Sequence, residues 1–152
     1  VDSRIYPSLQ KMFNDARASG LALFVREGYR TFQDQKQIMD EKIRAYENQG
    51  NSKHQATRMV AKYVAIPGTS EHQLGLSIDI NADQTKCSSE KVYRWLDNNA
   101  YKYGFIKRYP SSKSYITGIN NEPWHYRYVG KEAAATMKNQ NLCLEEYLKK
   151  YK

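Results

Sequence analysis

Two histidines and two acidic residues of this sequence stand at spacings from which a metal site can be built. His72 lies seven residues before Asp79, and Glu122 lies three residues before His125. The third histidine, His54, lies in a polar segment with no candidate partner near it in sequence. Two imidazoles and one carboxylate are ligands that a catalytic zinc ion takes from its protein, with a fourth position left for water. These residues therefore predict a zinc site of the catalytic kind.

The local sequence around His72 and Asp79 fits that chemistry. We expect His72 to end a loop and Gly75 to allow a tight bend, after which Asp79 returns on the adjoining strand. Asp79 stands between Ile78 and Ile80, so its side chain points away from theirs, toward a cleft and not the core. An aspartate among such apolar neighbours needs a cation or hydrogen-bond donors to offset its loss of hydration.

Each of these residues also has a plainer interpretation. A single histidine is more often a surface residue or a hydrogen-bonded core residue than a ligand. Asp79 could brace a turn, and Glu122 could be a surface acid before a proline. The His-to-Asp spacing alone carries little information, whereas its combination with Glu-x-x-His and an upstream Gly-Tyr-Arg at residues 28–30 is more specific.

The elements that must position these residues can be predicted from the spacing of apolar side chains. We expect helices over residues 3–19, 31–48 and 53–63, from a cap at Ser88 or Ser89 to about residue 100, and, as one or two helices, over 131–150. We expect strands over residues 21–25, 76–80, 105–109 and 124–129, with a turn at 67–70. The later strands lie too close together for helical crossovers. The pattern therefore predicts an α+β domain whose small, mostly antiparallel sheet is flanked by helices, with the zinc site in a cleft on the sheet.

Length and composition indicate one globular domain over residues 1–152. The chain has 152 residues, of which 40% are hydrophobic and 26% charged, as in soluble globular proteins. No stretch approaches the roughly 20 apolar residues of a membrane-spanning helix. The first residues do not resemble a signal segment, and a signal or membrane anchor outside this sequence would not be visible in it.

The charge and the cysteines leave alternatives open. Twenty-four Lys and Arg residues against 16 Asp and Glu residues give a net charge of +8. Such an excess suits nucleic acid, an anionic membrane or an acidic cell-wall polymer, but the basic residues are scattered, as on an ordinary solvated surface.

Cys87 and Cys143 lack a metal-binding CxxC spacing, and they either pair in an oxidising compartment or are two buried thiols. We expect them to be unpaired.

The sequence resembles the zinc D,D-carboxypeptidases of the VanY type, within a larger group that includes D-alanyl-D-alanine dipeptidases, L,D-carboxypeptidases and phage endolysin peptidases. Residues 70–79 match the SxHxxGxxxD pattern of that group. Residues 122–130 contain its ExxH pattern and are similar to the VanY branch in particular. Residues 28–31 with Gln35 resemble its Ser-Gly-Tyr-Arg-Ser segment, and residues 144–148 resemble its closing helix. The resemblance covers nearly the whole chain.

Two positions depart from the family pattern. Glu27 stands where a serine is common before Gly-Tyr-Arg, and Ser77 stands where an alanine is common before the metal-binding aspartate. Neither is an expected ligand, but Glu27 could alter how substrate is held near Arg30.

The resemblance implies a zinc ion held by His72, Asp79 and His125, with Glu122 as the general base. Glu122 would take a proton from the attacking water and pass a proton to the departing amine. Pro123 favours an extended backbone at Glu122, which would hold the base at a fixed offset from His125.

The resemblance also implies a set of substrate-binding residues. Arg30 would face the substrate as a permanent cation that grips a carboxylate or stabilises the oxyanion. Gln35 and Ser70 would bind substrate beside it. Trp124 and the many tyrosines could line the cleft, although core packing is the default for most of them.

A member of this group is expected to release the terminal D-alanine from peptidoglycan stem peptides or precursors that end in D-Ala-D-Ala. Removal of that residue depletes the target of vancomycin, which implies a role in glycopeptide resistance. We expect the partner to be this peptide and not nucleic acid, and we expect a monomer. The protein would act outside the cytoplasm, at the membrane or cell wall of a bacterium, or in the cytoplasm if it is of the VanXY kind.

Two alternatives remain. An L,D-carboxypeptidase that trims tetrapeptide stems would share all these motifs. A non-catalytic module could instead use a structural zinc and bind peptidoglycan through its basic, tyrosine-rich surface. Structural zinc sites are normally closed by four protein ligands, whereas here only three converge, and a glutamate lies beside them.

Overall fold

The sheet that positions the candidate site has four strands. The computed structural model describes residues 1–151. It places β1 (Leu23–Glu27), β2 (Ser77–Ala82), β4 (His125–Tyr128) and β3 (Phe105–Lys107) side by side in that order. All three strand pairings are antiparallel. This confirms the predicted α+β class with a small antiparallel sheet flanked by helices.

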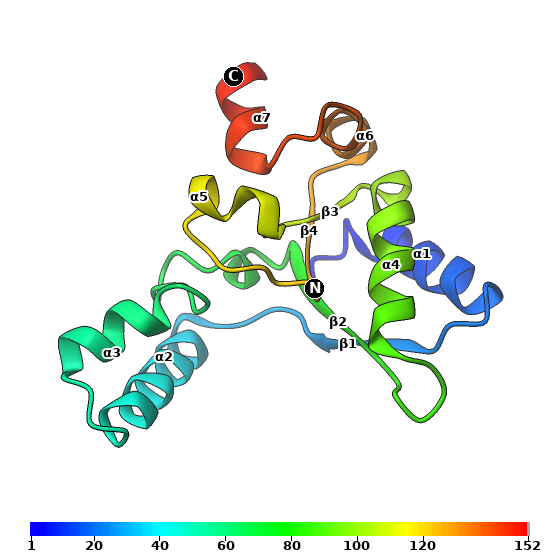
Figure 1. Ribbon diagram of the computed structural model, residues 1–152. Coiled ribbons are helices and arrows are strands. Elements are labelled where there is room, and N and C mark those ends of the chain that lie inside the picture. Colours follow the sequence, from blue (N-terminus) through cyan, green and yellow to red (C-terminus); the bar gives the residue numbers. More distant parts are fainter. Residues whose placement is uncertain (152) are drawn as a thin grey trace.

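One face of the sheet is covered by α1 (Tyr6–Ala18) and α4 (Ser89–Asn99), which lie together beside the strands in Figure 1. The main core lies between these helices and the sheet, and it includes Ile78 and Ile80 of β2 and Tyr126 of β4, all fully buried. Burial of each large apolar side chain stabilises the fold by about 1.5–3 kcal/mol. Side chains alternate along a strand, so the strand residues next to Ile78, Ile80 and Tyr126 point to the opposite face.

A hairpin of α2 (Phe32–Glu47) and α3 (Lys53–Val60) projects from one end of the molecule (Figure 1). It has its own apolar cluster, formed by Met39, Ile43, Ala56, Val60 and Val64. Both helices begin with a capping box, in which the N-cap and N3 side chains satisfy each other's backbone N–H groups, Thr31 with Asp34 and Ser52 with Gln55. The base of this hairpin lies next to the candidate site.

The C-terminal segment folds as two helices, α6 (Lys131–Gln140) and α7 (Leu144–Tyr151), at the end of the molecule away from the hairpin (Figure 1). Asn141 between them adopts a left-handed conformation with φ 51°, which ends α6. Ile106 of β3 packs with Ala134 and Met137 of α6 in a third cluster. The remaining elements are short: η1 (Glu71–Leu74), η2 (Ala100–Tyr103), η3 (Ser111–Lys113) and α5 (Ser114–Thr117).

Several predicted boundaries were wrong. The first strand spans residues 23–27 and not 21–25, because its limits follow its pairing with β2, from Leu23 opposite Ala82 to Glu27 opposite Asp79. The first helix begins at Tyr6 and not at residue 3, with Pro7 in its first turn, where the missing N–H is tolerated. The helix predicted over 53–63 ends at Val60, and the strand predicted over 105–109 ends at Lys107.

Cys87 and Cys143 are free thiols, as expected.

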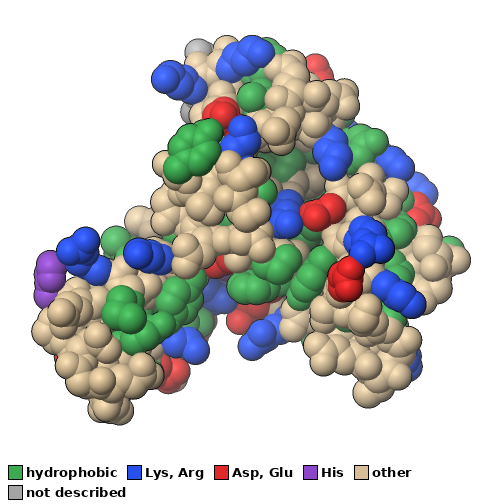
Figure 2. Space-filling model, viewed as in Figure 1, with side chains coloured by type: hydrophobic (Ala, Val, Ile, Leu, Met, Phe, Trp, Pro, Cys, Tyr) green, Lys and Arg blue, Asp and Glu red, His purple; other side chains and the backbone are tan. Residues whose placement is uncertain are grey.

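Within residues 1–151, no helix combines the length and the apolar character that crossing a membrane requires. On the face drawn in Figure 2, the Lys and Arg side chains are dispersed among neutral and acidic ones and do not form a single patch.

Candidate metal centre and active site

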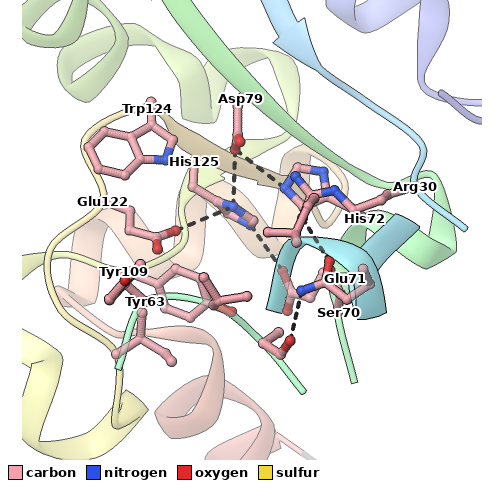
Figure 3. Close-up of a pocket in the computed structure, with 15 residues that line it drawn as sticks. Arg30, Tyr63, Ser70, Glu71, His72, Asp79, Tyr109, Glu122, Trp124 and His125 are labelled. Carbon is pink, nitrogen blue, oxygen red and sulfur yellow. Dashed lines mark hydrogen bonds and ion pairs between the residues drawn. The ribbon is translucent and has the colours of Figure 1, made fainter. Parts of the chain in front are cut away.

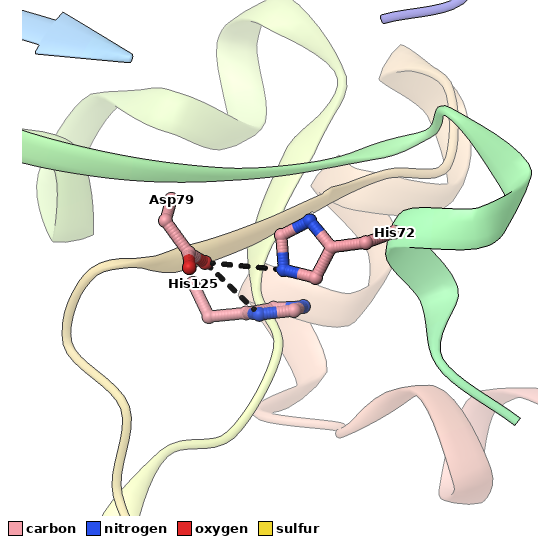
Figure 4. Close-up of side chains that lie close together, drawn as sticks. All are labelled: His72, Asp79 and His125. Carbon is pink, nitrogen blue, oxygen red and sulfur yellow. Dashed lines mark ion pairs between the residues drawn. The ribbon is translucent and has the colours of Figure 1, made fainter. Parts of the chain in front are cut away.

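His72, Asp79 and His125 come together from three elements, as the sequence predicted. His72 belongs to η1, Asp79 to β2 and His125 to β4. Asp79 and His125 lie directly opposite each other in the antiparallel pairing of β2 with β4. One ligand atom from each residue lies within 4.8 Å of the others. Asp79 Oδ1 is 3.4 Å from His72 Nε2 and 3.2 Å from His125 Nδ1, as Figure 4 shows.

Hydrogen bonds of the backbone fix the His72 ring. His72 Nδ1 lies 2.8 Å from the carbonyl oxygen of Gly28, which can only accept, so Nδ1 carries the proton and Nε2 is left free to bind a metal ion. The Arg30 N–H donates in return to the His72 carbonyl. Gly75 ends η1 with φ 69°, and a Cβ there would lie 3.1 Å from the Asp2 backbone nitrogen. The predicted bend at Gly75 therefore requires glycine.

The geometry of the three residues fits a tetrahedral zinc ion. Zinc bonds of about 2.0–2.1 Å in a tetrahedron place ligand atoms about 3.3–3.4 Å apart, close to the two separations measured from Asp79 Oδ1. Among the described residues, Asp79 Oδ1 is buried without a hydrogen-bond partner. A buried carboxylate oxygen that faces two imidazole nitrogens without hydrogen bonding to either is suited to a cation held between them.

Charge in this group is strongly coupled. Burial opposes ionisation of Asp79, but the two histidines outweigh it and hold the pKa of its carboxyl well below the usual range. Burial likewise opposes charge on His125, yet the neighbouring carboxylates of Asp79 and Glu71 raise its pKa to about 9. The pocket thus draws a positive charge to the place where the ligand atoms converge.

Glu122 is buried beside the three candidate ligands and is not one of them. Its Oε2 atom lies 3.6 Å from His125 Nδ1, and Figure 3 shows its carboxylate turned toward the His125 ring. Burial, with a smaller contribution from Asp79, raises the pKa of Glu122 to about 7. A carboxyl group with a pKa near neutrality can both accept and return a proton, as a general acid–base requires. Its backbone is fixed because Glu122 N–H donates to the Tyr109 carbonyl at 3.0 Å.

Arg30 reaches the same cavity from the base of the hairpin. Its Nη1 atom donates to Gln35 Oε1 at 2.7 Å, and its Nη2 atom lies 3.3 Å from Glu27 Oε2. Gln35 is 1% exposed and its amide nitrogen donates to the Ala65 carbonyl at 2.7 Å, so both its polar ends are engaged within the protein. In this structure Gln35 positions Arg30, and its predicted contact with substrate stays a prediction.

The seven predicted site residues line one cavity of about 140 Å³ (Figure 3). Ser70 is among them, buried at the start of η1. Trp124, considered as a lining residue, is also there. Tyr63 and Tyr109 also line the cavity, as was considered possible for the tyrosines as a group, whereas Ile38, Val64, Ala65, Glu71 and Ile119 were not predicted to line it. Of these only Glu71 carried a signal, since it stands between two motif residues, Ser70 and His72.

Comparison with known proteins identifies the family. Residues 1–131 match the sequence model of VanY D-alanyl-D-alanine carboxypeptidase. The chain therefore belongs to the VanY family of carboxypeptidases, whose motif residues form the cavity described above. Over 148 residues it is 55% identical to a D-alanyl-D-alanine carboxypeptidase of Enterococcus faecalis, a match that covers 97% of this chain and 55% of the relative. The chain thus spans about half the length of that relative.

Two solved structures are closely similar to this fold. VanYB in complex with D-alanine-D-alanine superposes with a TM-score of 0.98 at 55% identity, over 100% of this chain and 84% of that one. A glutamate-to-alanine mutant of the D,D-pentapeptidase VanY from the VanB-type resistance cassette, in complex with Zn(II), gives 0.94 at 55% identity, over 97% and 83%. Those structures contain a D-Ala-D-Ala ligand and a zinc ion, respectively.

Removing any one ligand should lower metal occupancy. We expect His72→Ala, Asp79→Ala and His125→Ala to lose most bound zinc, because each leaves only two protein ligands for an ion that requires more. The measurement is zinc per chain by elemental analysis after dialysis against a zinc buffer. His54→Ala is the matched control, since His54 is exposed on α3, and it should bind zinc like the parent protein. Equal loss in the control, or full occupancy in the ligand variants, would contradict the assignment.

Proposed function

We propose that this chain is a zinc-dependent D,D-carboxypeptidase that releases the terminal D-alanine from peptidoglycan stem peptides ending in D-Ala-D-Ala. The observation that best supports the proposal is that one cavity contains a three-residue ligand set, a buried glutamate with a pKa of about 7 and an arginine. The match to the VanY family over residues 1–131 supports the choice of substrate. A structural zinc would need no such glutamate, which argues against a non-catalytic module.

The residues have distinct roles in this proposal. His72, Asp79 and His125 would hold zinc, which supplies Lewis acidity and a water of lowered pKa at neutral pH. Glu122, beside them, would accept the proton of the attacking water and deliver a proton to the departing D-alanine nitrogen. The apolar and aromatic lining of the cavity would exclude bulk water and strengthen each of these electrostatic interactions.

Arg30 would restrict the enzyme to the peptide bond at the C-terminus of its substrate. Its guanidinium is held on the cavity wall by Gln35 and Glu27, which limits the positions that a substrate carboxylate can take. An arginine can bind such a carboxylate through two parallel hydrogen bonds, so a free C-terminus is recognised and an internal peptide bond is not. Ser70, buried in the same cavity, would add a hydroxyl contact to the bound peptide.

The cellular setting follows from the substrate in this proposal. Stem peptides lie at the outer side of the membrane, so we place the activity there, and loss of terminal D-alanine would confer resistance to vancomycin. The net charge of +8 suits the acidic polymers of a cell wall. We also propose that the protein acts as a monomer, because a single chain supplies all the residues of the cavity.

A panel of substrates tests the proposed specificity. We expect the pentapeptide stem to be trimmed to the tetrapeptide, with slow turnover of the tetrapeptide stem and of free D-Ala-D-Ala. Products are identified by mass spectrometry with and without a zinc chelator. Rapid conversion of tetrapeptide to tripeptide would instead indicate an L,D-carboxypeptidase, and rapid cleavage of the free dipeptide would indicate a dipeptidase.

Replacement of Glu122 should separate catalysis from metal binding. We expect Glu122→Gln to keep zinc and substrate affinity but to lower kcat on the order of 10²–10⁴-fold, because the amide cannot accept the proton. Steady-state kinetics on the pentapeptide, with zinc analysis of the same sample, measures both effects. Glu132→Gln on the exposed surface of α6 is the control. Normal turnover by Glu122→Gln would require another base.

Replacement of Arg30 should weaken recognition of the free C-terminus. We expect Arg30→Ala to lower kcat/KM for the pentapeptide by about 100-fold or more, through loss of a charge-assisted contact. A pentapeptide with an amidated C-terminus should be a poor substrate for the parent and nearly as poor for the variant. Arg26→Ala, exposed on β1, serves as the control. If both peptides lost activity equally on mutation, Arg30 would not be the carboxylate-binding residue.

A further inference from the structure

Glu71 is a buried carboxylate beside the candidate metal centre to which the proposed mechanism gives no role. It is the first residue of η1, directly before His72, and its Oε2 atom lies 3.7 Å from His125 Nε2. We propose that Glu71 is a positioning residue that orients His125 as a metal ligand, and that Arg108 links this carboxylate to the C-terminal helix α7. The inference rests on the proposed zinc site and adds a fourth residue, Glu71, which would orient a ligand without binding the metal itself.

The two histidines differ in how their second nitrogen is satisfied. His72 uses Nε2 toward Asp79 and donates from Nδ1 to the Gly28 carbonyl. His125 is turned the other way, with Nδ1 toward Asp79 and Nε2 toward Glu71. His125 Nε2 is buried, and Glu71 is the carboxylate that faces it. A metal-bound imidazole usually donates its other N–H to a carboxylate or carbonyl, which fixes the ring and makes it a more basic ligand.

The two oxygens of Glu71 are held differently. Oε1 accepts from Arg108 Nε at 2.7 Å and lies 3.1 Å from Arg127 Nη1. Oε2 accepts from the Ser77 hydroxyl at 3.2 Å and otherwise faces His125. Two arginines on one oxygen fix the plane of the carboxylate and leave the other oxygen directed at the imidazole. Ser77, one of the two departures from the family pattern, thus contributes to this support.

Arg108 extends the connection to α7. Its Nη1 and Nη2 atoms donate to the two carboxylate oxygens of Glu145 at 3.0 and 2.7 Å, a bidentate pair. Its backbone N–H donates to the His125 carbonyl at 3.1 Å. Arg108 therefore holds His125 at its backbone and, through Glu71, at its ring. Glu145 belongs to α7, so Arg108 also connects the Glu71 carboxylate to the C-terminal helix.

Zinc affinity of Glu71→Gln tests the proposal. We expect zinc to bind about 10–100-fold more weakly than in the parent, the range usual for loss of such a support, as measured by competition with a chromogenic chelator. The absorption spectrum of the cobalt-substituted variant should also change, because the His125 ring is less constrained. Zinc affinity and cobalt spectrum equal to those of the parent would overturn the proposal.

The control variant is Glu145→Gln, which removes the other partner of Arg108 but contacts neither His125 nor the cavity. We expect it to bind zinc more tightly than Glu71→Gln and close to the parent. Equal weakening by both variants would mean that Glu71 only neutralises Arg108, which overturns a role toward His125. Thermal unfolding of the zinc-free variants, followed by circular dichroism, verifies that both are folded.

A measurement on the parent protein keeps the proposal testable if Glu71→Gln does not fold. The chain has three histidines, so ¹⁵N-histidine labelling gives few ring signals to assign. We expect the zinc-loaded protein to show a slowly exchanging, downfield Nε2 proton on His125, alongside the Nδ1 proton of His72. If the His72 proton is seen and that of His125 exchanges freely, Glu71 does not hold the ring. A parent protein that binds no zinc would overturn both this inference and the proposed function.

Discussion

The antiparallel register between β2 and β4 determines the site. It pairs Asp79 with His125, Ile78 with Tyr126 and Ser77 with Arg127. Ile78 and Tyr126 are fully buried in the core, so the other two pairs must face the opposite side. One pair supplies two of the proposed metal ligands, and the other contacts Glu71. A slip of one residue would exchange the faces and bury Asp79 in the apolar core, so hydrophobic packing enforces the geometry of the candidate metal centre.

The charges on that face would be costly if they were unpaired. Asp79, Glu71 and Glu122 are all largely buried, and each would lose hydration without compensation. Glu71 is balanced by two arginines, which together with His125 outweigh burial and lower its pKa to about 2. Within residues 1–151 no arginine forms an ion pair with Glu122, and burial outweighs the influence of His125 and Arg30 and raises its pKa to about 7. Two glutamates beside the candidate metal centre thus acquire different protonation behaviour, and of the two Glu122 is the one suited to exchange protons near neutral pH.

The placement of residues that depend on local patterns could be predicted from the sequence. His72 and Asp79 stand in one short motif, and alternation along a strand was sufficient to place Asp79 on the open face. It did not reach Arg108, because the contacts of that residue with Glu71 and Glu145 join positions 37 residues apart in each direction. Strand limits also failed for this reason: the extent of β1 depends on its partner and not on its own apolar residues.

Arg30 is the part of the site that is held from outside strands β2 and β4. Gln35 fixes its guanidinium from α2, Glu27 approaches it from the end of β1, and its own N–H donates to the carbonyl of His72. The last contact ties Arg30 to a proposed metal ligand, so rigid connections set the distance between its guanidinium and the candidate metal centre. In an exopeptidase this distance determines which peptide bond is presented, and an error of about 1 Å can cost about 100-fold in rate. Glu27, in place of the serine common in the family, adds a further restraint on the same guanidinium and partly offsets its charge.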